Sequence, residues 1–355
     1  MKTIILIITI TILCLGILTA CGEDTQEASP SPSEPRTLTV MTHDSFAISE
    51  MVATQFEQEN NVKMAFLKSG DTGTALNKAI LSAGNPLADV FYGVDNTFLS
   101  RALDEGIFET YQSPLLDVIP DEYELDSSYQ ALPVDFGDVC LNYDIAYLTE
   151  RNLAPPANLE DLLKPEYKGM LVVENPATSS PGLAFLLATI GHFGPDGYLD
   201  YWQGLVENDL LVVNDWEVAY YTEFSRAGGT RPIVVSYGSS PAFEVIYAET
   251  PLEDAPTGAV TADESCFRQI EYVGILKGTA NRDLAQKWVD FMLSTPFQED
   301  MPLQMFVFPV NSQAELTEDF KQHMVVPQKP AYVSPQDIAA NREAWIQAWT
   351  ETVLR

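Results

Sequence analysis

Three short polar segments in the first third of the chain carry residue types that bind small ligands. Each follows an apolar run that predicts a β-strand, and each contains an aspartate: Asp44, Asp71 or Asp95. In parallel α/β sheets the carboxyl ends of the strands lie at one edge, where ligands bind. Three carboxylates there would create a negative potential suited to a cation. Aspartate also caps helices, so capping is the alternative role for each. The segments are 42–46, 70–73 and 93–96.

The middle of the chain adds hydroxyl groups and aromatic rings at predicted turns. Ser179 precedes a predicted helix, where hydroxyls and free backbone N–H groups suit a phosphate or another polar tail. A helix cap with proline in the first turn explains the same residues equally well. Trp216, Tyr237 and Phe243 flank later turns. Aromatic faces attract flat cations by roughly 0.5–2 kcal/mol each, although core packing is the alternative for any single ring.

Residues that enzymes use for covalent or metal chemistry are sparse. The three histidines, His43, His192 and His323, lie far apart and lack metal-ligand spacing. The sequence has no Gly-x-Ser-x-Gly elbow, phosphate-binding loop or dinucleotide-binding glycine motif. We therefore expect a binding protein rather than an enzyme, with no catalytic residue, metal or cofactor.

Predicted strands and helices alternate along the body of the chain, which indicates an α/β fold with a mostly parallel sheet covered on both faces. Ser334 opens a final helix on which Trp345 and Trp349 share a face and should pack as core. Strands are predicted at 38–41, 62–67, 88–92, 170–173, 210–213, 233–236 and 270–276, and helices at 48–59, 75–83, 96–103, 159–163, 181–190, 197–206, 216–224, 242–248 and 283–293.

The N-terminus has the pattern of an export signal: a lysine, an apolar run and small residues. The ending Leu18-Thr19-Ala20-Cys21 resembles a bacterial lipobox, which implies cleavage after residue 20 and lipid attachment to Cys21. A helix that stays in the membrane is the alternative, because the run is near the lower length limit for spanning. Residues 21–36, rich in proline, serine and charge, are predicted to be a disordered tether.

Charge and cysteine content narrow the possible partners. The chain has 19 basic and 51 acidic residues, a net charge of −32. Such a surface repels nucleic acid and anionic lipid and favours cationic ligands; adaptation to a salty or acidic habitat would explain it too. Apart from the signal and the lipidation site, only Cys140 and Cys266 remain. In an oxidising compartment a disulfide is the natural pairing, and two buried thiols are the alternative.

At these residues the chain resembles the thiamine-binding proteins of bacterial ABC thiamine importers. The resemblance holds in order and spacing from about residue 37 to residue 355. The matching pieces are Leu38-Thr39-Val40, Asp44-Ser45-Phe46-Ala47, Ala88-Asp89-Val90, Gly93-Val94-Asp95-Asn96, Thr178-Ser179-Ser180-Pro181-Gly182-Leu183, Ser236-Tyr237, Ser240-Pro241-Ala242, Phe308-Pro309-Val310 and Ala339-Ala340-Asn341-Arg342-Glu343-Ala344-Trp345.

The resemblance implies a two-lobed type II periplasmic binding protein with a ligand cleft between the lobes. The first lobe would comprise 37–138 and a return segment, 269–355, and the second lobe 139–268. Crossovers are expected near 138–143 and 265–270, so that each contains one of the two cysteines.

The resemblance also assigns ligand contacts. Asp71 falls at an acid that contacts the ligand, Ser179 at a contact to its polar tail, and Trp216 and Tyr237 at pocket aromatics. His43, Phe243 and Phe306 stand where Tyr, Tyr and Trp are expected, and a Trp expected shortly after Phe46 is missing, with Glu50 nearby. Stacking survives such changes, but hydroxyl and indole hydrogen bonds do not. We hypothesise that a pyrimidine ring stacks between Phe243 and Phe306, with the acids facing the positive charge.

The resulting expectation is a monomeric extracytoplasmic lipoprotein that captures thiamine, its phosphates or a related small organic cation for the permease subunits of an ABC importer. It would be anchored to the membrane by its lipid and would bind no nucleic acid. Ferric iron, polyamine or phosphonate binding is the nearest alternative, and Tyr220-Tyr221 is a pair of the kind iron sites use. A secreted enzyme on a basic substrate, with Cys140 or Cys266 as nucleophile, is a third reading.

Overall fold

The computed structural model describes residues 35–355. The predicted signal peptide (1–20), the lipidation site Cys21 and the tether up to residue 34 therefore lie outside the described residues. Arg36, the last residue of the predicted tether, already belongs to the first strand. Among the described helices, none combines the length and apolarity needed to cross a bilayer.

The first lobe is built on three parallel strands, with β1 between β2 and β3. The strands are apolar runs, and the helices that connect them begin at capping side chains. Ser49 accepts a hydrogen bond from the Val52 N–H at the start of α1, and Asp71 caps α2. The elements are β1 (Arg36–Thr42), α1 (Glu50–Asn60), β2 (Val62–Lys68), α2 (Thr72–Leu81), β3 (Val90–Asp95) and α3 (Leu99–Asp104).

The second lobe repeats this arrangement, with β6 between β8 and β7 and all three parallel. Its central helix α5 is capped by Ser179 and is buried along most of its length, consistent with its nearly continuous apolar sequence. The elements are α4 (Ile145–Glu150), β6 (Leu171–Glu174), α5 (Ser180–Phe193), α6 (Tyr198–Glu207), β7 (Leu211–Val213), α7 (Trp216–Val218), a π-helical turn (Ala219–Glu223), β8 (Ile233–Tyr237) and α8 (Ser240–Ile246).

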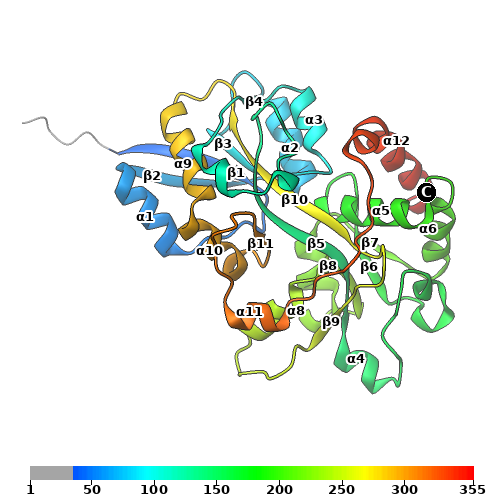
Figure 1. Ribbon diagram of the computed structural model, residues 1–355. Coiled ribbons are helices and arrows are strands. Elements are labelled where there is room, and N and C mark those ends of the chain that lie inside the picture. Colours follow the sequence, from blue (N-terminus) through cyan, green and yellow to red (C-terminus); the bar gives the residue numbers. More distant parts are fainter. Residues whose placement is uncertain (1–34) are drawn as a thin grey trace, which may run out of the picture. The chain divides into compact units, whose positions relative to one another are not determined.

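Two long strands, β5 (Leu132–Asp144) and β10 (Phe267–Leu276), join the lobes (Figure 1). They are antiparallel to each other, β10 is antiparallel to β3, and β5 is antiparallel to β8. The strand order is β2-β1-β3-β10-β5-β8-β6-β7. The prediction of parallel strands is thus right within each lobe and wrong at the centre, because two strands must carry the chain between the lobes.

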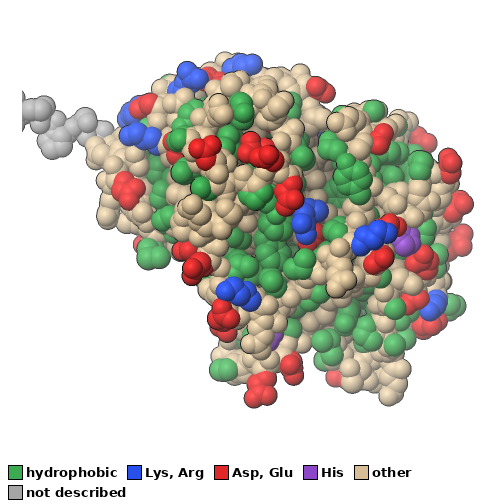
Figure 2. All heavy atoms as spheres, in the orientation of Figure 1, with side chains coloured by type: hydrophobic (Ala, Val, Ile, Leu, Met, Phe, Trp, Pro, Cys, Tyr) green, Lys and Arg blue, Asp and Glu red, His purple; other side chains and the backbone are tan. Residues whose placement is uncertain are grey.

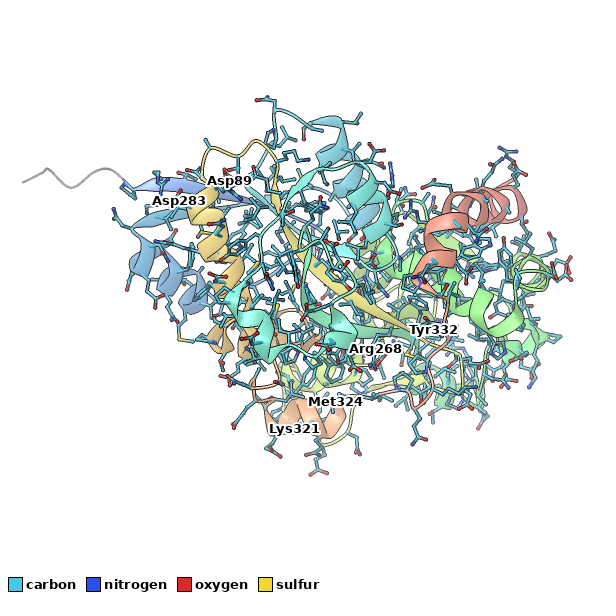
Figure 3. All side chains as sticks on the ribbon, turned by 45° about the horizontal axis from the view of Figure 1, so that its top comes forward. Asp89, Arg268, Asp283, Lys321, Met324 and Tyr332 are labelled. Atoms are coloured by element: carbon cyan, nitrogen blue, oxygen red, sulfur yellow. A yellow bond between two sulfur atoms is a disulfide. The ribbon has the colours of Figure 1, made fainter. Side chains whose placement is uncertain are left out.

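A disulfide joins Cys140 of β5 to Cys266, the residue before β10, with 4.4 Å between the Cα atoms. The alternative of two separate thiols is therefore wrong. Next to the bond, Arg268 donates to both carboxylate oxygens of Asp138 across the same pair of strands, at 2.9 and 2.8 Å. Figure 3 labels Arg268 near the middle of the molecule, where these strands run side by side. The crossovers are held by one covalent bond and one bidentate ion pair.

The last part of the chain contributes to both lobes. Helices α9 and α10 pack with α1, whereas α12 lies against α6, with Trp349 edge-on to Trp202 at 5.4 Å. Ser334 caps α12 as predicted, and Trp349 is buried with Trp345 packed against the same core. The predicted lobe boundaries stay predictions. The remaining elements are β4 (Phe108–Glu109), β9 (Thr257–Val260), α9 (Arg282–Leu293), α10 (Thr295–Gln304), β11 (Phe308–Pro309), α11 (Glu318–His323), α12 (Pro335–Val353), and 3₁₀ turns at Pro114–Val118, Asp121–Tyr123, Glu160–Leu163, Pro165–Tyr167 and Ser225–Ala227.

Candidate ligand-binding site

A cavity of about 200 Å³ lies between the two lobes and is lined by side chains from both. We call it the first cavity. The start of α2 and the loop after β1 form one side, and the starts of α5, α7 and α8 form the other. Gln269 and Glu271 of β10 and the segment at the end of α10 complete the wall. Six of the nine predicted ligand residues line it: His43, Asp71, Trp216, Tyr237, Phe243 and Phe306.

Trp216 and Tyr237 present aromatic rings whose polar atoms already have partners. The Trp216 indole N–H donates to the Ser236 hydroxyl at 3.0 Å, and its ring stacks on Tyr220 with centroids 5.2 Å apart. The Tyr237 hydroxyl donates to the Gln269 side-chain oxygen at 2.9 Å. These bonds fix both rings in place, so the wall is preorganised to contact a flat ligand.

Asp71 holds the two lobes together at the cavity. Its carboxylate accepts the Thr72 backbone N–H of α2 at 2.7 Å and the Trp216 N–H at the start of α7 at 3.3 Å. Burial raises the pKa of Asp71, while hydrogen bonds from the Ser179 hydroxyl and the Thr72 N–H and the charge of His43 oppose the rise. One carboxylate therefore caps α2, bonds the first N–H of α7 in the opposite lobe, and faces the cavity.

A buried ionisable cluster forms the floor of the first cavity. The His43 Nε2 lies 3.3 Å from a carboxylate oxygen of Glu271. The Tyr92 hydroxyl donates to Asp135 at 2.6 Å and to Glu271 at 3.1 Å. Burial raises the pKa of Asp135 well above its usual range, and the charge of Glu271 adds to the rise. Burial opposes ionisation of Glu271, but His43 outweighs it and lowers that pKa. Glu271 is thus the ionised member and Asp135 the protonated one.

The same cluster raises the pKa of His43. Burial lowers its pKa, but the charge and hydrogen bond of Glu271, with smaller contributions from Asp71 and Asp44, raise it overall. An ionised His43 neutralises one carboxylate, so Glu271 and Asp71 together leave a net negative charge at the cavity wall.

Comparison with known proteins identifies the architecture. A family model described as "Bacterial extracellular solute-binding protein" matches residues 85–338. The chain belongs to this family. This solute-binding protein is 29% identical to the "Thiamine-binding periplasmic protein" of Escherichia coli (strain K12), over 96% of this chain and 99% of the relative. It is therefore related to binding proteins rather than enzymes.

Solved structures show the same two-lobed fold. The solute-binding protein is similar to a "Periplasmic thiamin binding protein" with a TM-score of 0.80 and 27% identity, covering 92% of this chain and 98% of that one. It is also similar to a "Ferric binding protein from Campylobacter jejuni", with a TM-score of 0.70 and 20% identity, covering 89% and 99%. At that identity the second likeness concerns the fold alone.

The sandwich hypothesised between Phe243 and Phe306 does not agree with the solute-binding protein's structure. The two rings contact each other, with centroids 4.2 Å apart and planes at 61°. A ring held between two others needs about 7 Å between them, since stacked carbons are about 3.5 Å apart. Phe306 has a left-handed backbone (φ 57°), and its carbonyl oxygen accepts the Ser239 hydroxyl. The pair forms one aromatic wall instead of two faces.

Three predicted ligand residues do not line the first cavity. Asp44 accepts the Gly70 N–H at 2.8 Å and lines an adjoining cavity. Ser179 is fully buried, caps α5 and bonds Asp71. Asp95 is fully buried beneath the cleft, where it accepts the Ser180 hydroxyl and the Gln269 amide. A ligand role for these three stays a prediction, and Ser179 and Asp95 bond residues that line the cavity.

Several wall residues were not predicted from the sequence. Glu271 is the main one, and its signal was present: a single acid inside the otherwise apolar predicted strand 270–276. Gln269 lies two residues before Glu271 on β10, so the two side chains are on the same face of the strand. No sequence pattern points to the stretch around Met305, since it follows a helix that was not predicted. Ser45 and Thr72 belong to the predicted polar segments 42–46 and 70–73, and Tyr220 and Tyr221 form the pair of the iron alternative. The other wall residues outside the nine predicted ligand residues are Ala47, Ser180, Pro181, Glu217, Ser240, Gln269, Glu271, Gln304, Met305 and Val307.

The tyrosine pair of the iron alternative lines the cavity but is engaged elsewhere. The Tyr220 hydroxyl donates to Glu244 at 2.8 Å, and its ring is buried against Trp216 and Phe224. Within residues 35–355, no three His, Cys, Asp or Glu side chains are arranged as metal ligands. No observation at this site favours a metal over an organic ligand.

Proposed function

We propose that this solute-binding protein captures thiamine, or a closely related small organic cation, outside the cytoplasm and delivers it to the permease subunits of an ABC importer. The observation that carries the proposal is the shared cavity in which Asp71 and Glu271 face the rings of Trp216 and Tyr237. Carboxylates and aromatic faces are the groups that recognise a flat, delocalised cation.

The chemistry of thiamine fits this wall. Its thiazolium ring carries a permanent positive charge that the net negative cavity would balance. Its aminopyrimidine can donate hydrogen bonds to a carboxylate and lie against an aromatic face. The relatives named as thiamine-binding proteins, similar over nearly the whole length, support the same ligand.

Lipid anchoring at Cys21 is a separate part of the proposal. It is supported by the sequence Leu18-Thr19-Ala20-Cys21 and by the proline-rich residues that follow. Metabolic labelling with a radioactive fatty acid tests it. Label should enter the protein and be lost in the Cys21→Ala variant; an unlabelled protein of full precursor mass would support the retained-helix alternative.

The test of the ligand is native mass spectrometry of protein purified without added ligand and then incubated with equimolar thiamine, choline and a polyamine. We expect a single adduct with the mass of thiamine. Exclusive binding of the polyamine, or of iron present in the preparation, would refute the proposal. Denaturing spectra of the same sample separate a bound ligand from covalent modification.

A further inference from the structure

A second cavity adjoins the first and shares part of its wall. Both are lined by Ser45, Asp71, Trp216, Glu217 and Tyr221, so a ligand in the first cavity can extend into the second. The second cavity is lined additionally by Asp44, Asp215, Val218 and Thr222.

The ionisable side chains at these walls are mostly acidic. The second cavity has four acids, Asp44, Asp71, Asp215 and Glu217, and within the described residues no lysine, arginine or histidine lines it. The first cavity has His43 as its one basic side chain, and Glu271 lies 3.3 Å from the His43 Nε2. Neither wall therefore offers a free cation to a phosphate.

The local potential also acts on a neighbouring buried group. Glu174, at the end of β6, is fully buried and neither of its carboxylate oxygens has a hydrogen-bond partner. Burial raises its pKa well above the usual range, and the charges of Asp71 and Asp215 raise it further. Burial is the main cause of this rise, and the two neighbouring carboxylates act in the same direction.

Backbone N–H groups at helix starts could have replaced basic side chains as phosphate ligands. At the starts of α2 and α7, three of these groups are already bonded to the protein's own carboxylates. Asp71 accepts the N–H groups of Thr72 and Trp216, and Asp215 accepts the Val218 N–H at 2.8 Å. Each carboxylate stands where a phosphate oxygen would have to bind.

From these observations we propose that the cleft selects the unphosphorylated cation and rejects its phosphate esters, with Asp215 and Glu217 as specificity determinants. The inference rests on the proposed function and deepens it by naming the form of the ligand. A phosphate placed in the second cavity would meet four carboxylates at close range without compensation.

The test compares thiamine, thiamine monophosphate and thiamine diphosphate by calorimetric titration of the purified protein. Repulsion by several carboxylates predicts that the diphosphate binds about a hundredfold more weakly than thiamine at low salt, and that higher ionic strength narrows the gap. If thiamine binds and the dissociation constant of the diphosphate is within about tenfold of that of thiamine, the inference is wrong while the proposed function stands. If thiamine itself fails to bind, the proposed function is wrong and the inference falls with it.

A double variant, Asp215→Asn with Glu217→Gln, isolates the cause. Asparagine preserves the cap on α7 and glutamine preserves side-chain volume, so the change is mainly one of charge. The ratio of the diphosphate and thiamine dissociation constants should fall by about tenfold. The matched control, Glu166→Gln with Asp200→Asn, removes two exposed charges that line neither cavity and should leave the ratio unchanged. An unchanged ratio in the first variant would overturn the assignment of these two residues.

Discussion

At the scale of residues, single carboxylates in the cleft combine a structural role with an electrostatic one. Asp71 caps α2, bonds the Trp216 N–H and faces the cavity. A residue at the carboxyl end of a parallel strand also lies at the start of the next helix. Asp71 can therefore cap the helix and contact the ligand at the same time, so the two roles that the sequence leaves open do not exclude each other. Its substitution should separate the two roles.

The Asp71→Asn variant tests the charge alone. Asparagine caps helices about as well as aspartate, so the fold should be retained. Removing one negative charge beside a bound cation should weaken thiamine binding by about tenfold or more. Calorimetric titration measures the loss, and Asp200→Asn, on the exposed side of α6, is the control. An unchanged affinity would exclude a direct role of the Asp71 charge.

Asp95 gives a pH-dependent prediction. Burial raises its pKa to about 6, against the hydrogen bonds from Ser180, Thr97 and Phe98 that lower it. The folded state then holds this proton more tightly than the unfolded state, so its contribution to stability is present below pH 3.8 and is lost as the pH rises through about 6.

The unfolding free energy of the protein relative to Asp95→Asn should accordingly fall by about 2 kcal/mol between pH 4 and pH 7. Urea titrations of both proteins across this range measure it, since other groups titrate alike in the two. If the difference in unfolding free energy between the two proteins stays constant or grows with pH, the result would contradict a raised pKa of Asp95.

At the scale of elements, apolar runs and capping residues were sufficient to predict the parallel strands of both lobes and the helices that connect them. Helix α10 was missed because it contains Pro302, and proline normally disfavours a helix interior. Much of β5 was missed because Asp135 and Asp138 interrupt its apolar pattern. Those acids are buried only because Tyr92 and Arg268, distant in sequence, bond them. Such tertiary pairing leaves no local signal in the sequence.

The contact between the starts of α2 and α5 gives a prediction at this scale. Gly73 lies against the backbone before α5, and a methyl group there would come within 2.9 Å of the carbonyl oxygens of Ala177 and Thr178. Backbone atoms cannot yield as a side chain does, so Gly73→Ala should hold the lobes apart. Small-angle scattering with saturating ligand should give a larger radius of gyration than for the unmodified protein, and affinity should fall.

The control for this variant is Leu81→Ala, on the same helix but exposed to solvent. It should change neither the scattering nor the affinity. If Gly73→Ala binds and closes like the unmodified protein, the contact between α2 and α5 does not limit closure.

At the scale of the whole molecule, a strongly acidic surface surrounds a cleft that is stabilised at its crossovers. Figure 2 shows carboxylates scattered over both lobes on the face drawn, so the net charge is not confined to the site. The disulfide, in contrast, acts at one place, the crossovers between the lobes. The disulfide joins residues 126 positions apart and closes a loop that contains most of the second lobe.

The double variant Cys140→Ala, Cys266→Ala should lower the unfolding free energy by about 4–5 kcal/mol, because the unfolded chain regains the freedom of that loop. Chemical denaturation measures the change. The unmodified protein in excess dithiothreitol serves as the control and should approach the variant's stability. Equal stability of the variant and the oxidised protein would show that the bond contributes nothing.

Titration of the purified, ligand-free protein with thiamine by isothermal calorimetry tests the central claim most directly. Two lobes closing on a preorganised aromatic and acidic wall predict one site per chain with a dissociation constant below about 1 μM. Absence of heat at micromolar protein, with a folded and disulfide-bonded sample, would contradict the assignment of thiamine to this cleft.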